Sequence, residues 1–500
     1  MNREFQRCAG ILMPIASLPS DEGIGSFGAE ARAFAAMLDE AGVRLWQILP
    51  LGPVGFGNSP YQTFSSFAGD EHYISLDLLW QEGLLSEKPE RFLWQDPKRI
   101  DYEAMKLFKE AYLHLASQAF YAQETLPEDY EDFLDLDWVY PYAVFRALKT
   151  ANGERSWFDW PAPQRDWILD REYDVSGLEE DIRYHLFVQY KFAKQWQALK
   201  ADVNALGIEI LGDLPFYVGH DSLDVWMHRE EFRLDEDGRP THVAGCPPDG
   251  FSDDGQRWGN PLYDWDHMQA NDFFFWTERL RYSASLYDIL RIDHFRAFDT
   301  YWEIPAEDST ARGGRWIETP GYALFDHVFA ELPDLRIIAE DLGSELRPEL
   351  FELLDHYGLM GMNVALYTLC NNWDEPKKHQ LIYSSTHDTN TVRGWYSGMD
   401  DAGKSEYLRR LRPYGYFWDP VSEKMMAYVC RSICDLVMIP LPDVLNLGSD
   451  AQINHPGTVG SPNWEWHLPG LGLFDLKLAD LRYLLARTNR IPEDRSQEWT

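Results

Sequence analysis

The segment Leu290–Phe298, LRIDHFRAF, places several reactive side chains at the end of an apolar run that begins at Leu286. Asp293 lies between Arg291 and Arg296, and His294 follows it directly. An aspartate flanked by cations should have a lowered pKa and stay ionised, which suits a carboxylate nucleophile. An ion pair that only holds a loop at a strand end would place the same residues there, so the local pattern leaves both interpretations open.

Two further acids follow similar apolar runs. Glu340 comes directly after one such run, and Asp388 stands beside His387 after another. Partial burial should raise the pKa of Glu340 and keep it protonated, as a general acid requires, and the neighbouring Asp341 would act in the same direction. Retaining glycosidases use two carboxyl groups about 5–5.5 Å apart, and a third acid could hold sugar hydroxyls in the transition state. Binding of a divalent metal and capping of the following helices are the alternatives.

Eight short apolar runs, each ending in polar or Gly- and Pro-rich residues, alternate with helical segments along the chain. Such runs are typical of parallel strands buried on both faces, and their alternation with helices predicts a (β/α)8 TIM barrel. A doubly wound open sheet is the alternative, but no Gly-rich phosphate loop follows the first run. In these barrels the chemistry lies at the C-terminal ends of the strands. The predicted strands are Cys8–Ile15, Arg44–Leu51, Ile208–Leu214, Leu286–Ile292, Leu335–Ala339, Gly361–Tyr367, Leu381–Ser385 and Leu436–Ile439.

The pattern predicts one catalytic barrel over residues 1–500, with a first helix at Ala29–Ala41 that Gly42 ends. Large, mainly helical insertions are expected to form subdomains around the mouth of the active site, at about 65–200, 214–285, 300–334 and 395–434. An amphipathic helix, Ile182–Leu199, closes the first of them. The segment Pro240–Tyr263 is too polar and too rich in Gly and Pro for regular structure, and long loops of this kind are commonly functional.

The composition narrows the class of partner. The net charge is −37, from 45 Lys and Arg against 82 Asp and Glu, so nucleic acids and anionic membranes are poor partners. No window is apolar over the roughly 18 residues of a membrane span. Five cysteines without a metal or redox pattern suggest a reducing, cytoplasmic location, and Cys430 and Cys434 are expected to be buried thiols. The aromatic share of 15% fits stacking on sugars or simply a large core.

Seven long motifs in order resemble the amylomaltases, or disproportionating enzymes, which are 4-α-glucanotransferases related to the α-amylase superfamily. The resemblance runs from GILMPIASLP at Gly10 to SPNWEWHL, which ends at Leu468. The motifs themselves are WQILPLGPVGFGNSPYQTFSSFAG from Trp46, GDLPFYVGHDSLDVW from Gly212, VAGCPPDGFSDDGQRWGNPLY from Val243, RIDHFRAF from Arg291, IIAEDLG from Ile337, STHDTNT from Ser385 and NHPGT from Asn454.

The resemblance implies a role for each matching residue. It implies that Asp293 is the nucleophile, Glu340 the general acid and base, and Asp388 the stabiliser of the transition state. It implies no metal or organic cofactor, and α-1,4-glucans and maltooligosaccharides as donor and acceptor. The sequence leaves the oligomeric state open between a monomer and a homodimer. The implied substrate-binding residues are Arg291, which orients the nucleophile, His294 and His387, which bind hydroxyls, Tyr61, which stacks on the reacting sugar, Asp213 behind it, and Ser59, Asp249, Gln256, Trp258, Asn260 and Asn463, which line the glucan groove.

The chain departs from the family pattern at a few positions. Gly250 stands where a tyrosine is usual, so one stacking surface on the acceptor side is expected to be missing. Ala297 replaces a usual glycine, and Leu366 a frequent glutamine. Phe56 and Tyr102 match a remote glucan-binding patch but fit ordinary packing equally well. A hydrolase that uses water as acceptor, and a glucan-binding protein without catalysis, are the alternative functions.

Overall fold

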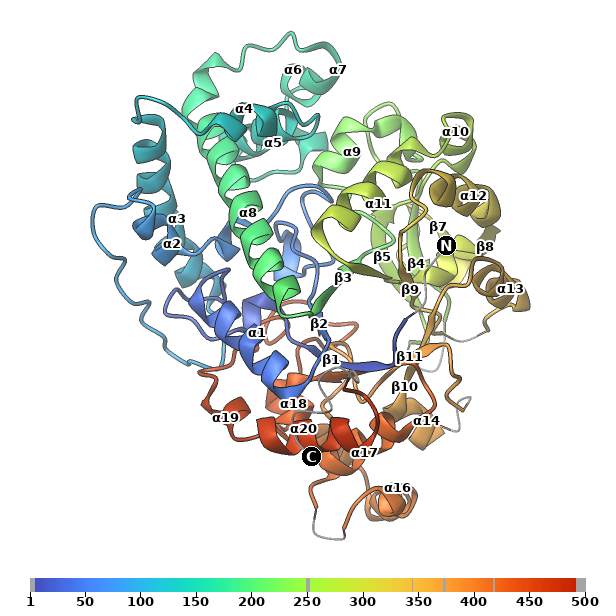
Figure 1. Cartoon of the computed structure of the whole chain (residues 1–500). Helices are drawn as coiled ribbons and strands as arrows, with labels where there is room; N and C mark the ends of the chain where they lie inside the picture. The colour runs from blue at the N-terminus through green and yellow to red at the C-terminus, as the bar shows by residue number, and fades with distance from the viewer. Residues whose placement is uncertain (1–4, 249–251, 344, 372–374, 417–418, 492–500) are drawn as a thin grey trace.

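Eight parallel strands form the sheet at the centre of the molecule, in the order β10-β11-β12-β1-β2-β3-β6-β9 (Figure 1). The computed structural model describes residues 5–248, 252–343, 345–371, 375–416 and 419–491. The sheet curls until β9 meets β10, where the Ala339 amide donates to the Met360 carbonyl, so the barrel is nearly closed. The (β/α)8 architecture predicted from the sequence is therefore confirmed. Its strands are β1 Cys8–Leu12, β2 Leu45–Gln47, β3 Glu209–Leu214, β6 Ile289–Ile292, β9 Ile337–Ala339, β10 Gly361–Val364, β11 Gln380–Tyr383 and β12 Leu436–Pro440.

All the barrel strands except β12 are shorter than the apolar runs that predicted them. After β2, the residues Leu49 and Leu51 are still buried, although they lie beyond the paired part of the strand. After β10, the chain turns at once into helix α14, Ala365–Asn371, where the prediction continued the strand. The apolar pattern reports burial in the core, which continues past the last ladder hydrogen bond.

Helices cover the outside of the barrel. The first, α1, spans Ala29–Ala41 as predicted, and Gly42 ends it with φ 80°, a left-handed conformation that costs glycine little. Its buried face includes Phe34 and Leu38, which lie one helical turn apart. Further helices of the chain are α11 Phe274–Leu286, α12 Gly321–Glu331, α13 Pro348–Tyr357, α15 Val392–Gly398, α16 Asp401–Leu411, α17 Val421–Arg431, α18 Leu441–Val444, α19 Gly472–Asp475 and α20 Leu478–Arg487.

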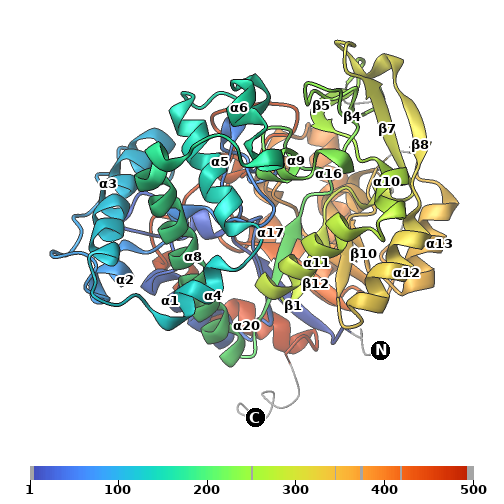
Figure 2. The same ribbon diagram turned by 90° about the horizontal axis from the view of Figure 1, so that it is seen from above.

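The insertion between β2 and β3 is helical and groups on one side of the barrel (Figures 1 and 2). Its last helix, α8, spans Glu179–Ala205 and differs from the amphipathic helix that was expected. Every residue from Tyr184 to Phe192 is buried, because α8 packs between the barrel and the insertion's own helices. The others are α2 Leu76–Gln81, α3 Tyr102–Tyr121, α4 Glu128–Leu134, α5 Val139–Ala151, α6 Ala162–Arg165 and α7 Trp167–Asp170.

A four-stranded antiparallel sheet, in the order β5-β4-β7-β8, lies on the other side of the barrel (Figure 2). The prediction that Pro240–Tyr263 lacks regular structure is wrong, since β4 spans His242–Cys246 and β5 spans Gln256–Pro261. The strand β4 pairs with β7, Thr300–Pro305, from the following insertion, and β7 pairs with β8, Arg315–Glu318. Partners that distant in sequence supply the ladder that local composition did not predict. Two short helices, α9 Leu223–Met227 and α10 Trp265–Ala270, flank this sheet.

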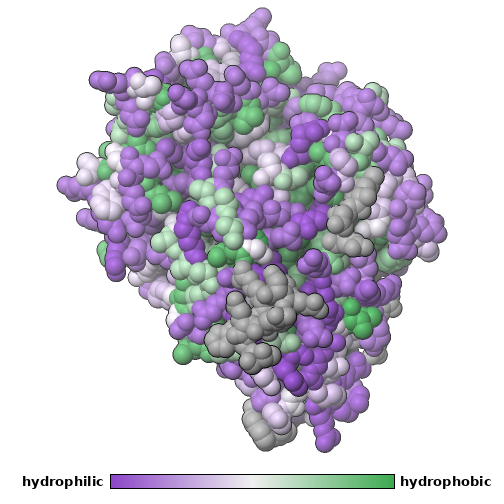
Figure 3. Space-filling view, viewed as in Figure 1, coloured by the Kyte–Doolittle hydropathy of each residue, from purple (hydrophilic) through white to green (hydrophobic). Residues whose placement is uncertain are grey.

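Hydrophilic side chains predominate on the face seen in Figure 3, with apolar residues scattered among them. Within the described part of the chain, no helix combines the length and apolarity needed to cross a membrane.

Cys430 and Cys434 are buried and form no disulfide, as predicted. The Arg490 side chain is fully buried and donates to the backbone carbonyls of Cys8 and Cys430, so it joins the segment after α20 to the start of β1.

A buried ion pair in the helical insertion predicts pH-dependent stability. His72 Nδ1 lies 2.6 Å from Asp70 Oδ1, and its Nε2 lies 3.8 Å from Glu110. Burial opposes the charge of His72, but Asp70 and Glu110 outweigh it and raise the pKa of His72 to about 9. This pair therefore stabilises the fold fully below the unfolded pKa of about 6.5, and the stabilisation is lost as pH rises through 9.

We expect His72→Gln to lose up to about 3 kcal/mol of this stability near neutral pH, and to show a flatter stability profile than the wild type between pH 7 and 9. Urea unfolding midpoints at several pH values measure the effect. His185→Gln is the control, because burial lowers the pKa of His185 and leaves it neutral over this range. Parallel profiles for wild type and His72→Gln would contradict the assignment.

Candidate active site

Arg291 is the centre of a buried ionic cluster inside the C-terminal end of the barrel. Its guanidinium donates to Asp213 at 2.5 Å and to Asp293 at 3.2 Å, and lies 3.2 Å from Glu340. Arg291 itself is only 3% exposed. A buried cation needs partners of opposite charge, and here three carboxyl groups share one guanidinium.

The order of the strands explains why these residues meet. The strands β3, β6 and β9 are neighbours, and Asp213 on β3 pairs in register with Arg291 on β6. Ile292 at the end of β6 pairs with Ala339 on β9, so Asp293 and Glu340 both follow directly at the same edge. Arg291 and Asp293 are two residues apart, and side chains at that spacing point to the same side of a strand.

His294 has a left-handed backbone conformation, with φ 52°, which is uncommon for a residue with a side chain. This conformation directs the His294 amide to Glu340 Oε2 at 2.7 Å. Burial lowers the pKa of the His294 imidazole to about 4, against the charge of Glu340, so the ring is neutral at pH 7. Its ring packs edge-on against Trp258, with centroids 5.0 Å apart. Strained backbone of this kind often marks functional sites.

The protonation order expected for the two central acids is wrong in the unliganded site. Burial and the charge of Glu340 raise the pKa of Asp293, although Arg291 opposes this. Burial also disfavours the charge of Glu340, but Arg291 and hydrogen bonds from Asp293 and the His294 amide outweigh it and lower the pKa of Glu340. Burial raises the pKa of Asp213 as well. Because one guanidinium cannot neutralise three buried carboxylates, the Asp293–Glu340 pair favours holding a shared proton.

Asp388 lies on the opposite side of the cluster, after β11. The Asn454 side chain donates to its Oδ1 at 2.6 Å, and His387 Nε2 lies 3.1 Å from its Oδ2. Burial opposes the charge of Asp388, but His387 and Asn454 outweigh it and lower the pKa of Asp388 to about 2. Asp388 is therefore ionised at any pH near neutrality.

Tyr61 links the two sides. Its hydroxyl donates to Asp213 at 2.8 Å and lies 2.8 Å from His387 Nε2, and its ring stacks on the His387 ring. Since the hydroxyl donates to Asp213, the His387 nitrogen donates in turn to the hydroxyl. Burial and the charge of Asp213 raise the pKa of Tyr61 well above its usual value, so Tyr61 remains neutral.

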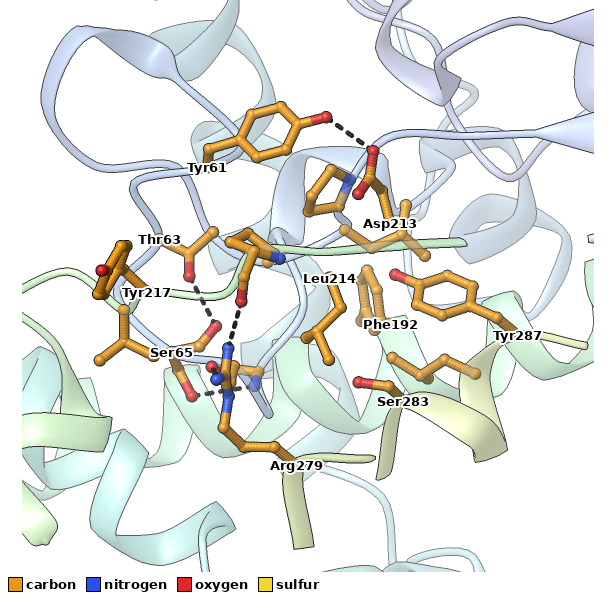
Figure 4. A pocket seen from close by; sticks show the side chains of 18 residues that line it. Tyr61, Thr63, Ser65, Phe192, Asp213, Leu214, Tyr217, Arg279, Ser283 and Tyr287 are labelled. Carbon is orange, nitrogen blue, oxygen red and sulfur yellow. Dashed lines mark hydrogen bonds between the residues drawn. The ribbon is translucent and has the colours of Figure 1, made fainter. Parts of the chain in front are cut away.

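A small cavity of about 40 Å³ lies behind Tyr61 and Asp213 (Figure 4). At its wall, Arg279 of α11 donates to the carbonyls of Pro215 and Phe216, which follow β3, and to the hydroxyl of Ser66. Arg279 is 1% exposed. It thus connects the segment after β3 to the segment that carries Tyr61, and supports both from behind.

The remaining predicted groove residues lie around this cluster. Trp258 and Gln256 are on β5 and are joined by a hydrogen bond of 3.1 Å. Ser59 accepts the Tyr61 amide. Two others are buried and bonded within the protein: Asn260 donates to the Val218 carbonyl, and Asn463 accepts the amide of His455 and donates to Thr458. Asp249 and Gly250 lie outside the described residues.

Asn454 is a site residue to which the sequence assigned no role, although it begins one of the recognised motifs. Besides the bond from its side chain to Asp388, its backbone amide donates to the His387 carbonyl at 3.0 Å. The contact joins residues 66 apart in the chain, so local spacing could not reveal it. Among the described residues, no group of three or more His, Cys, Asp or Glu side chains is arranged to hold a metal ion.

Known proteins resemble the chain over nearly its whole length. A family model described as 4-alpha-glucanotransferase matches residues 13–473. A 4-alpha-glucanotransferase of Thermus thermophilus is 41% identical over 98% of this chain and 100% of its own, and one of Clostridium butyricum is 37% identical over 95% and 99%. The solved structure of an amylomaltase from Streptococcus agalactiae in complex with acarbose is 36% identical, with a TM-score of 0.91, over 97% of this chain and 100% of that one.

Proposed function

The chain belongs to the 4-alpha-glucanotransferase family and is a glucanotransferase, and we propose that it transfers α-1,4-glucan segments between maltooligosaccharides by a retaining double displacement. In this proposal the whole chain acts as one catalytic domain. The segment after β2 supplies Tyr61, the antiparallel sheet supplies Trp258, and the barrel supplies the acids.

The contact between Asp293 and Glu340 carries the proposed mechanism. Asp293 Oδ1 and Glu340 Oε2 each lie 3.2 Å from the same nitrogen of Arg291, Nη2. Inverting glycosidases hold their carboxyl groups about 6.5–9.5 Å apart, to leave room for a water molecule, whereas retaining enzymes hold them about 5–5.5 Å apart. Two carboxyl groups that share one nitrogen at this distance are closer together than the inverting spacing, which supports the retaining arrangement.

In the first step, Asp293 attacks the anomeric carbon of the donor sugar. The bond from that carbon to the glycosidic oxygen breaks, a bond to the Asp293 carboxylate forms, and the proton of Glu340 passes to the departing oxygen. When the donor binds, its glycosidic oxygen takes the place of the Asp293 carboxyl group as the neighbour of Glu340. The shared proton then belongs to Glu340, and Asp293, which still faces Arg291, is ionised for attack.

In the second step, Glu340 takes the proton of the acceptor's 4-hydroxyl, whose oxygen attacks the anomeric carbon and releases Asp293. Positive charge develops on the sugar in both transition states, and the ionised Asp388 is placed to stabilise it. Asp388, His387 and His294 offer groups that can bond the hydroxyls of the reacting sugar, while the Tyr61 ring supplies a stacking surface.

Incubation with maltotriose tests the choice between transfer and hydrolysis. We expect glucose together with a ladder of longer maltooligosaccharides and a nearly constant number of reducing ends, because transfer to a sugar hydroxyl conserves glycosidic bonds. Chromatography of the products and a reducing-end assay measure both. Reducing ends that rise in step with the maltotriose consumed, without longer products, would show a hydrolase. Absence of any product would favour a glucan-binding protein without catalysis.

A further inference from the structure

The segment Ser384–Val392, which carries His387 and Asp388, leaves the barrel at the end of β11 and returns at the start of α15. Its two ends meet one buried side chain from the next strand unit, Asp443, which lies on α18 directly after β12. Asp443 is 1% exposed. The strands β11 and β12 are neighbours in the barrel, which brings α18 under this segment.

Asp443 bonds to both ends of the segment at once. At the first end, the hydroxyls of Ser384 and Ser385 each donate to its Oδ2 at 2.6 Å. At the other end, the amide of Val392 donates to its Oδ1 at 2.8 Å. One carboxyl group therefore fixes the distance between the two ends of the segment that contains His387 and Asp388.

The bonds to Asp443 are short, buried and made by neutral donors, and no charged neighbour in the described part of the chain contributes to its environment. A buried carboxyl group without a cation has a high desolvation cost and is a poor choice for stability alone. Its geometry suits one task, which is to accept several donors from different directions.

We propose that Asp443 is a positioning residue, which holds the His387–Asp388 segment so that the Asp388 carboxylate faces the reacting sugar. Asn454 fixes that carboxylate from the front through its bond to Oδ1, and Asp443 fixes the backbone that presents it from behind. The inference rests on the role proposed for Asp388 in the transition state. It predicts that loss of Asp443 lowers kcat by a much larger factor than it raises KM, because the charge of Asp388 acts mainly on the positive charge that develops in the transition state.

The test compares four variants in the maltotriose reaction. Asp443→Ala leaves three donors unsatisfied and should lower kcat roughly 10- to 100-fold with little change in KM, since small misplacements of catalytic groups have effects of that size. Asp443→Asn can still accept from Val392 while its amide group donates to the serine hydroxyls, so it should recover most of the activity. The double variant Ser384→Ala, Ser385→Ala should show the same kcat effect in weaker form. Glu231→Gln is the matched control, because Glu231 is a carboxylate 2% exposed that accepts from Asn271 and has no contact with the segment.

Thermal unfolding of each variant separates positioning from stability. A fall in kcat that is much larger than any rise in KM for Asp443→Ala, with wild-type kinetics for Glu231→Gln, supports the inference. Wild-type kcat for a folded Asp443→Ala, or an equal loss for Glu231→Gln, overturns it. If Asp443→Ala does not fold, the kcat of the double variant Ser384→Ala, Ser385→Ala tests the inference by the same criteria. Failure of the proposed function would give a different result, because the wild type itself would then form none of the longer maltooligosaccharides from maltotriose.

Discussion

Asp293→Asn is expected to reduce product formation from maltotriose by at least about 10⁴-fold, because loss of a nucleophile removes the covalent route entirely. The fold should be retained. Burial raises the pKa of Asp293, so the folded protein already disfavours its charge, and a neutral amide removes that cost at pH 7. Chromatography of the products measures activity, thermal unfolding measures stability, and calorimetric titration with maltotriose measures binding.

Asp299→Asn is the matched control for this variant. Asp299 lies six residues further along the chain, burial raises its pKa too, and its ion pair is with Arg347, outside the cluster. Its variant should keep nearly the wild-type activity. Near-wild-type product formation by Asp293→Asn would remove Asp293 from the mechanism. Unfolding of Asp293→Asn would instead assign Asp293 to a structural ion pair with Arg291.

Glu340→Gln is expected to lower turnover of maltotriose by roughly 10³-fold or more, because the leaving sugar then departs without a proton. A glycosyl fluoride should restore part of the first step, since fluoride needs no proton to leave. The second step should remain slow, because the same residue must activate the acceptor. The glucosyl-enzyme should therefore accumulate, and mass spectrometry of peptides should find the sugar on Asp293.

Asp341→Asn serves as the control for the neighbouring acid. Asp341 is buried, and burial raises its pKa to about 6, but its carboxylate accepts the amide of Met362, and the ion pairs of Arg291 are with Asp213, Asp293 and Glu340 instead. Its variant should turn over maltotriose and accumulate no adduct. Release of fluoride by Glu340→Gln without an adduct on any carboxyl group would count against the retaining mechanism.

Much of the barrel followed from the sequence, because strands buried on both faces must be apolar along their whole length. All eight strands occur where such runs were found, and α1 has the predicted bounds. Asp293, Glu340 and Asp388 were placed at the ends of strands for the same reason, since the polar residues begin where the buried ladder stops. Several motifs that carry the family resemblance lie at these strand ends and contain the three proposed catalytic acids.

Tertiary structure alone decided how the site is charged and supported. The directions in which the pKa values of Asp293 and Glu340 shift depend on which carboxyl group accepts a hydrogen bond from the His294 amide, and on how three acids share Arg291. These distances cannot be deduced from the residues that neighbour each acid in the sequence. The strand β4 formed in a polar segment because β7 pairs with it from another insertion. The contacts of Asn454 with Asp388, and of Asp443 with Ser384, Ser385 and Val392, join residues more than 50 positions apart. Hydrogen bonds between distant segments arise only when the barrel closes and brings the ends of its strands together.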